Sequence, residues 1–398
     1  MKKTFLALAA LGTFTSVAQA QSSVTLYGIV DEGLNAVSNV QTAPGQGGRQ
    51  YALVSGVMQG SRWGLKGAED LGGGLQAVFT LENGFDLNTG AFGQGGAEFG
   101  RQAYVGLSSA QYGSLTLGRQ YDAVVDFVGP LNAGDQWEGG YAAHPGDLDN
   151  FNNSVRVNNA IKYTSVNYGG LTFEGLYSLG GKAGSFSQNQ VYSFGMGYSQ
   201  GPLNLALAYL NSKNPNQSFF GDNPNGNATG GSNLSSPVYS GYASASSYQV
   251  IGAGASYAFG PATVGLTYSN TRFGNLGETA SGPNPAAYTG SAKFNSIEAN
   301  FSYQLSPSLV AGVAYNYTKG DGAHTSGGAG TGSAKYNQFA LGADYSMSKR
   351  TDVYVQGVYQ SALGNDSTGG KAVAAIAGLS PSANNHQAVA RVGIRHKF

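Results

Sequence analysis

Apolar and polar residues alternate with a period of two along most of the chain after residue 23. In the stretch 297–305, Ile297 and Phe301 would share one face of an extended strand, and Glu298 and Asn300 the opposite face, because successive side chains of a strand point to opposite sides. The same alternation recurs in 309–318 and 390–398. The pattern predicts an all-β protein whose strands have one apolar, aromatic face and one small or polar face.

The interruptions of this pattern fall into two classes that alternate along the chain. Short turns lie near 70–74, 109–113, 167–170, 199–202, 259–261, 306–308 and 347–349. Longer polar connections lie near 39–49, 88–99, 120–153, 180–190, 211–247, 270–292, 320–334 and 362–385. Seven short and eight long connections separate sixteen strands, and this asymmetry is typical of outer-membrane barrels. We therefore predict a single domain over 21–398, a 16-stranded antiparallel transmembrane β-barrel wide enough to enclose an aqueous channel.

A soluble β-sandwich would also alternate, with its apolar face turned to a core. A sandwich gives no reason for long loops at one end alone or for tyrosines that recur near the ends of strands. Tyrosines on the apolar faces, many of them near strand ends, are typical of the aromatic girdle at a membrane interface; they are Tyr163, Tyr177, Tyr198, Tyr209, Tyr257, Tyr268, Tyr303, Tyr317 and Tyr345. The tyrosines favour the barrel.

The first twenty residues have the features of a secretory signal. Lys2 and Lys3 precede an apolar run over 5–17, and small residues stand at Ala18 and Ala20. We predict a cleaved signal peptide over 1–20, with cleavage after Ala20. The apolar run is shorter than the roughly twenty residues of a membrane-spanning helix, so we expect membrane insertion to use strands.

Composition narrows the possible functions. Without the two lysines of the predicted signal, the chain has nineteen basic and twenty-one acidic residues, a formal net charge of −2, which disfavours nucleic-acid binding. The chain has no cysteine, so it forms no disulfide and no cysteine metal site. The 63 glycines would suit a disordered chain as well, but regular aromatic alternation argues against disorder.

The connection 120–153 concentrates the candidate chemistry, since it neither alternates like a strand nor carries a helical stripe. Basic residues bracket it, and it carries six acids: Asp122, Asp126, Asp135, Glu138, Asp147 and Asp149. We interpret it as a constriction loop that folds into the barrel, with Asp122, Asp126, Asp135 and Glu138 as the leading candidates to face the basic wall. The alternative for each acid is a solvated loop charge.

Strand alternation places the basic residues of the wall. Arg156 and Lys162 share one face, opposite Val157 and Ile161, and Arg62 lies opposite its apolar neighbour in the same way. A charge on the lipid face would cost roughly 2–4 kcal/mol at mid-membrane, so these charges are expected in the lumen. There they either filter solutes or only pair with neighbours to hold a loop down.

Enzymatic chemistry finds little support in the sequence. The four histidines, His144, His324, His386 and His396, lack metal-ligand spacing. Adjacent acids such as Asp31 and Glu32 point to opposite sides of a strand, which is poor geometry for paired acid and base catalysis. We expect no enzyme, no metal and no cofactor.

Several stretches resemble the trimeric general-diffusion porins of Gram-negative outer membranes, most closely the β-proteobacterial type. They are VTLYGIVDEGL at 24–34, SRWGLKGAEDLGGGLQAVFTLENGF at 61–85, GRQAYVGL at 100–107, GSLTLGRQYD at 113–122 and the terminal RHKF. The resemblance implies a homotrimer, a third external loop folded inward, and a basic cluster at the wall positions Arg62, Arg101 and Arg119, with Arg156 as a further member. Strand alternation adds Lys162 to the expected pore-lining bases. Phe398 resembles the terminal signal by which barrel precursors are recognised.

The chain departs from the enterobacterial members at two places. It reads GPLNAGDQWEGG at 129–140 where they have Pro-Glu-Phe-Gly-Gly, and Ile29 stands where they often have lysine. These departures leave open which loop acids act and which ions are preferred. We expect an outer-membrane porin for passive diffusion of small hydrophilic solutes and ions; a substrate-selective sugar or anion channel, or a structural or adhesive surface barrel, is the alternative. Lipid, lipopolysaccharide, periplasmic chaperones and the barrel-assembly machinery are the expected partners.

Overall fold

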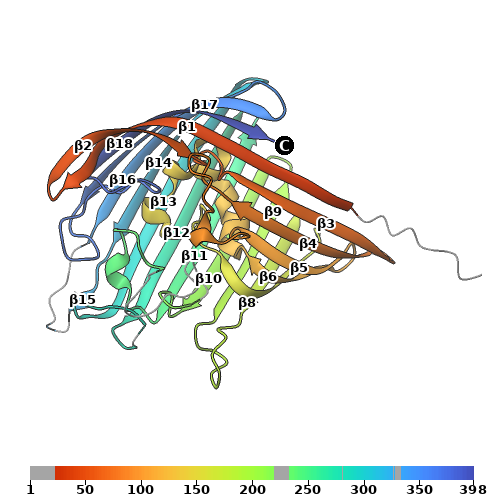
Figure 1. The fold of residues 1–398 in the computed structure, drawn as a ribbon, viewed down its shortest axis with the longest axis horizontal. Helices are drawn as coiled ribbons and strands as arrows, with labels where there is room; N and C mark the ends of the chain where they lie inside the picture. Colours follow the sequence, from red (N-terminus) through yellow and green to blue (C-terminus); the bar gives the residue numbers. More distant parts are fainter. Residues whose placement is uncertain (1–22, 219–232, 280, 326, 328–332) are drawn as a thin grey trace, which may run out of the picture.

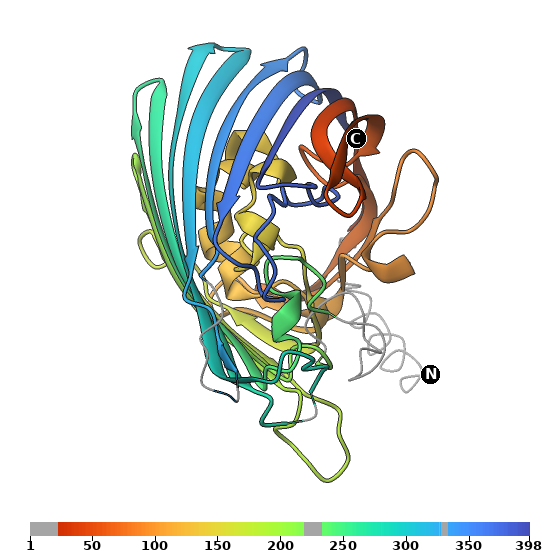
Figure 2. The same cartoon turned by 90° about the vertical axis from the view of Figure 1, so that its left-hand side faces the viewer.

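The computed structural model describes residues 23–218, 233–279, 281–325, 327 and 333–398. Its strands form one antiparallel sheet that closes into a barrel (Figures 1 and 2). The predicted signal peptide, 1–20, lies outside the described residues.

The barrel wall is built in chain order. Its strands are β1 (Ser23–Ala43), β2 (Gln46–Ser55), β3 (Arg62–Gly72), β4 (Leu75–Gly84), β5 (Gln102–Ser109), β6 (Gly113–Gln120), β7 (Val157–Thr164), β8 (Leu171–Ser178), β9 (Val191–Gln200), β10 (Leu203–Lys213), β11 (Ser247–Phe259), β12 (Ala262–Leu276), β13 (Tyr288–Ser306), β14 (Leu309–Gly320), β16 (Lys335–Ser346), β17 (Thr351–Leu363) and β18 (His386–Lys397). A two-residue strand, β15 (His324–Thr325), pairs with the start of β13.

The ring closes where the first strand meets the last. One edge of β1 pairs with β18, from Ile29 opposite Lys397 to Val37 opposite Val389. Its other edge pairs with β3 and then with β2, which are two halves of one interrupted strand. With β2 and β3 counted as one strand and the short β15 left aside, the wall has sixteen strands, so the predicted 16-stranded barrel is confirmed.

Alternating exposure identifies the two faces of the wall. Along β17, Tyr354 and Gln356 are 2% and 5% exposed, whereas Val355 between them is 51% exposed. Large apolar side chains stand exposed on the outer face of almost every strand, as expected where lipid replaces water. No helix among the described residues has the length and apolar character needed to cross a membrane.

The second strand differs from the prediction in two ways. The expected long connection at 39–49 is wrong, because β1 and β2 continue as a ladder to a tight turn at Pro44 and Gly45. Gly45 adopts a φ of 73°, which glycine reaches without strain. The break between β2 and β3 at 56–61, where Val57 and Met58 are buried, was not predicted either.

The connection between β6 and β7 contains five single helical turns. They are η2 (Val124–Val128), η3 (Gly129–Leu131), η4 (Gly134–Glu138), η5 (Gly140–Ala142) and η6 (Pro145–Asp147). Figure 2 shows these turns, in yellow and gold, within the ring of strands. A further turn, η1 (Gln94–Gly96), lies between β4 and β5, and η7 (Ser240–Tyr242) lies between β10 and β11.

Candidate functional site

Glycines on the inner face of the wall make room for the 120–153 segment. A Cβ added to Gly312 of β14 would collide with the ring of Trp137, and one added to Gly342 of β16 would collide with the Glu138 carboxyl. Four further inner-face glycines lie against apolar side chains of the segment in the same way: Gly195 and Gly197 against Phe127, Gly252 against Phe151 and Gly254 against Leu131. We call these six residues the glycine track. It lets the segment approach the wall closely.

Polar side chains of the wall fix the backbone of the segment. Glu298 of β13 accepts a hydrogen bond from the Ala133 amide at 2.8 Å. Gln338 of β16 donates to the carbonyl oxygens of Ala142 and Ala143, at 3.1 and 2.9 Å. These contacts satisfy backbone groups that the irregular segment cannot pair within itself.

A buried histidine joins the segment to two strands. His144 Nδ1 lies 2.6 Å from Asp149 Oδ2, and His144 Nε2 lies 3.6 Å from Glu298 Oε2. Ser269 of β12 donates to the same Asp149 oxygen. Burial alone would lower the pKa of His144, but the two carboxylates raise it to about 10, so the imidazole is charged at neutral pH. Sequence reasoning missed this cluster, although alternation already placed Glu298 on the inner face.

A cavity of about 780 Å³ lies between the segment and the wall. Three arginines line it, Arg62, Arg101 and Arg156, together with two acids of the segment, Asp126 and Asp135. Asp135 is exposed to this space. The structure thus brings together three of the five predicted bases and two of the four predicted acids.

Glu82 of β4 holds two of the arginines in place. Its Oε1 lies 2.7 Å from Arg101 Nε, and its Oε2 lies 3.7 Å from Arg62 Nε. Tyr27 and Tyr121 donate hydrogen bonds to the same carboxylate, at 3.0 and 3.2 Å. Sequence reasoning missed Glu82; strand alternation, which puts it opposite the apolar neighbour Leu81, was the signal that could have found it.

Tyr121 contacts two of the three cavity arginines. Its hydroxyl accepts a hydrogen bond from Arg101 at 3.1 Å, and the guanidinium of Arg156 lies over its ring, 5.8 Å from the centroid. A cation over an aromatic face is attracted to the ring. Tyr121 therefore orients Arg101 and Arg156 toward one cavity.

Lys162 of β7 pairs with acids and faces a second cavity. Its ammonium contacts Asp126 and lies 3.2 Å from Glu174 Oε2. These residues line a space of about 410 Å³ on the far side of Asp126. One predicted loop acid thus meets a predicted base of the flanking strand.

Arg119 lies apart from the other arginines of the predicted basic cluster. It shares its side of β6 with Leu115 and Leu117, which are exposed on the outer face, and it does not line either cavity. Its side chain donates to the Gly100 carbonyl at 2.7 Å and to Asn158 Oδ1 at 2.6 Å. The reason is the period of two, which carries an odd-numbered residue of this strand away from the lumen.

Asp122 and Glu138 also lie away from the cavity. Asp122 accepts a hydrogen bond from the Val124 amide at 2.9 Å and another from Asn150 Nδ2 at 2.9 Å. Glu138 is fully buried in the space left by Gly342, and this burial raises the pKa of its carboxyl well above the usual value. Asp122 therefore binds backbone and side-chain groups of the segment itself, and neither acid lines the cavity.

Phe398 lies at the seam of the barrel. Its backbone exchanges two hydrogen bonds with Gly28, at 3.0 and 3.1 Å, and its ring covers that glycine. The side chain remains 45% exposed.

Among the described residues, no group of histidines and acids is arranged to hold a metal ion.

Comparisons with known proteins agree with this architecture. A family model described as Gram-negative porin matches residues 7–365. An outer membrane porin protein of Bordetella pertussis is 34% identical over 394 residues, which cover 90% of this chain and 94% of that protein. An anion-selective porin from Comamonas acidovorans has a similar structure, with a TM-score of 0.69, 24% identity, and coverage of 95% of this chain and 100% of that one. The outer membrane protein OmpT of Vibrio cholerae, in a trimer form, matches with a TM-score of 0.61 and 15% identity over 95% of this chain and 99% of that one.

Proposed function

Since the chain belongs to the family of Gram-negative porins, we propose that its 120–153 segment is the inward-folded third external loop and narrows the channel. The protein is an outer-membrane porin, a water-filled barrel through which small hydrophilic solutes and ions diffuse passively. Diffusion down a concentration gradient needs neither nucleotide nor cofactor. We assign the barrel no enzymatic reaction.

The observation that carries the proposal is the charge of the 780 Å³ cavity. Three arginines and two aspartates line it, which leaves one positive charge in excess on the lining. Glu82, which contacts two of these arginines, does not line the cavity and is only 4% exposed. Positive charge along a water-filled constriction attracts anions and repels cations. We therefore propose a preference for anions, set by Arg62, Arg101 and Arg156, with Asp135 facing them across the gap.

A channel selective for one anion or sugar is the second candidate. Clustered arginines that converge on one cavity favour it, and a similar solved structure is an anion-selective porin. Such a channel would be blocked by its own solute, whereas a general porin would not. A structural or adhesive barrel would conduct no current.

The test is reconstitution in planar lipid bilayers with a salt gradient. The triple variant Arg62→Gln, Arg101→Gln, Arg156→Gln should shift the reversal potential toward cations, because it removes three positive charges from the cavity. Arg119→Gln is the matched control and should leave the reversal potential unchanged, because Arg119 does not line the cavity. Equal shifts in the triple variant and the control, or no shift in either, would overturn the assignment.

Assembly and export complete the proposal. We propose a homotrimer, supported by the trimer form of a similar solved barrel, embedded in outer-membrane lipid and lipopolysaccharide. A signal peptide over 1–20 directs export, and 21–398 is then the mature domain, which periplasmic chaperones and the barrel-assembly machinery receive through the terminal Phe398. Stepwise conductance in threes tests the trimer, and the first residue of protein extracted from membranes tests cleavage after Ala20.

A further inference from the structure

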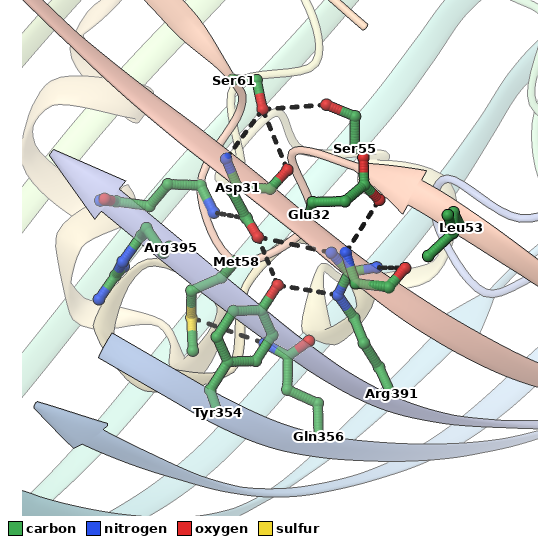
Figure 3. Close-up of polar contacts among 12 residues, drawn as sticks. Asp31, Glu32, Leu53, Ser55, Met58, Ser61, Tyr354, Gln356, Arg391 and Arg395 are labelled. Atoms are coloured by element: carbon green, nitrogen blue, oxygen red, sulfur yellow. Dashed lines mark hydrogen bonds and ion pairs between the residues drawn. The ribbon is translucent and has the colours of Figure 1, made fainter. Parts of the chain in front are cut away.

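A cluster of buried polar residues lies at the seam between the first and last strands. Asp31 of β1 and Arg391 of β18 have fully buried side chains, with Asp31 Oδ1 3.4 Å from Arg391 Nη2. The Tyr354 hydroxyl donates to Asp31 and accepts a hydrogen bond from Arg391 Nε at 2.9 Å. Figure 3 shows these three side chains facing one another, with Met58 and Gln356 beside them. We call Asp31, Tyr354 and Arg391 the seam cluster.

The seam cluster reaches the 120–153 segment by a first route through Asn35. Arg391 Nη1 donates to Asn35 Oδ1 at 2.9 Å and to the Gly33 carbonyl at 3.1 Å. The amide nitrogen of Asn35 then donates to the Tyr141 hydroxyl, which belongs to the segment. Tyr141 is 2% exposed, so this hydrogen bond is shielded from water and costly to leave unmade.

A second route runs through the break between β2 and β3. Asp31 Oδ2 accepts a hydrogen bond from the Gln59 amide at 2.8 Å. Two residues earlier, the Val57 carbonyl accepts the Gly140 amide of the segment at 2.7 Å. The break thus lies between the seam cluster and the segment and contacts both.

Both routes end at the walls of the cavity. Met58, Gln59 and Gly60 line one side of it, and Asp135, Gln136 and Gly140 line the side formed by the segment. Gln356, which lies two residues after Tyr354 on β17, also donates a hydrogen bond from its side-chain amide to the Glu138 carbonyl. The seam cluster therefore contacts the supports of both walls without lining the cavity itself.

We propose that Asp31, Tyr354 and Arg391 are positioning residues that hold the constriction at a fixed width. The proposal rests on the assignment of 120–153 as the constriction. Loss of the seam cluster frees Tyr141 and the 56–61 break together, and the segment then moves between its docked position and others. That motion appears as brief partial closures of single channels rather than as a change of charge selectivity.

The test compares two arginines of the same strand. Arg391→Gln removes the seam cluster's cation. Arg395→Gln is the matched control, because Arg395 lies four residues further along β18 and pairs instead with Asp344 and Asp352, at 3.1 and 3.0 Å. Tyr141→Phe removes one hydroxyl of the first route and leaves the barrel's ion pairs intact, so it decides the matter if Arg391→Gln does not assemble.

Single-channel recordings give the readout. Arg391→Gln and Tyr141→Phe should each raise the frequency of partial closures on the order of fivefold, the effect of losing about one buried hydrogen bond on an equilibrium, while Arg395→Gln keeps the wild-type frequency. Wild-type closure frequency in both Arg391→Gln and Tyr141→Phe, or an equal rise in Arg395→Gln, would overturn the proposal. An incorrect constriction assignment would be recognised by a different measurement. In that case the triple arginine variant would keep the wild-type reversal potential, whatever the closure frequencies are.

Discussion

The Glu82 carboxylate lies 2.7 Å from Arg101 Nε and 3.7 Å from Arg62 Nε, so one buried acid contacts two cavity arginines and offsets one of their charges. Glu82→Gln removes that negative charge and leaves the arginines in the cavity. We expect the reversal potential in a salt gradient to shift further toward anions, because the unbalanced positive charge beside the cavity increases.

The matched control for Glu82 is Glu69→Gln. Glu69 lies on β3 near the short turn, is exposed, and does not line the 780 Å³ cavity. It should leave the reversal potential unchanged. A shift of equal size in both variants would mean that net charge alone, and not the charge at the cavity, sets the ion preference.

His144 should stabilise the docked segment through its charge. His144→Gln removes one partner of a buried ionic cluster, which costs about 3–5 kcal/mol when the other charges stay buried. We expect a lower guanidinium midpoint for unfolding in detergent at pH 7. Glu69→Gln, which changes an exposed side chain of β3, is the control and should keep the wild-type midpoint.

The same histidine predicts an alkaline limit. Its folded-state pKa is raised from 6.5 to about 10, so its contribution is fully present below about pH 6.5 and is lost as the pH rises through 10. Wild type should lose more stability between pH 8 and pH 11 than His144→Gln does. Parallel alkaline losses in the two proteins would remove His144 from the explanation.

Glu138 should also make stability fall as the pH rises, but from a lower pH, because a carboxyl group has a lower ordinary pKa than an imidazole. Because burial raises the pKa of its carboxyl, the folded state holds the proton more tightly than the unfolded state, and stability falls as the pH rises above the ordinary value. Glu138→Gln keeps the shape without the charge. We expect the variant to match wild type in stability at pH 4 and to have a higher unfolding midpoint than wild type at pH 8. Its conductance should be unchanged, because Glu138 does not line the cavity. Equal unfolding midpoints of wild type and Glu138→Gln at pH 8 would contradict a destabilising charge on Glu138.

The glycine track should tolerate no added carbon. Gly312→Ala places a methyl group against the Trp137 ring, and overpacking of this kind costs typically about 1–3 kcal/mol. We expect a lower unfolding midpoint and a changed single-channel conductance, because the segment must shift. In Gly357→Ala, the control, the nearest atom to the new Cβ is 3.6 Å away, an ordinary contact, and wild-type behaviour is expected.

Strand number and barrel closure were predictable because the period of two is a local property that each strand carries in its own sequence. The same rule applied to Arg119 would have removed it from the basic cluster, since Leu115 and Leu117 lie on its side of β6. Family resemblance placed it there instead. Local alternation was the better guide at this position.

The partners of the inner-face residues were not predictable in the same way. Alternation puts Glu298 on the inner face, but its contact with His144 joins residues 154 positions apart and depends on the path of an irregular segment. The positions of the loop acids depend on the same irregular path. Asp135 reaches the cavity, whereas Glu138, three residues later, is buried against Gly342.

The glycine track also bears on the order of folding. Its six members come from β9, β11, β14 and β16, and none of these strands is adjacent to β6 or β7. The inner surface that the glycine track forms for the 120–153 segment therefore exists only after these strands have paired in the barrel. Contacts so distant in sequence form late, since loop closure must precede them. The channel would then be wide when the barrel first closes and would narrow in a final step.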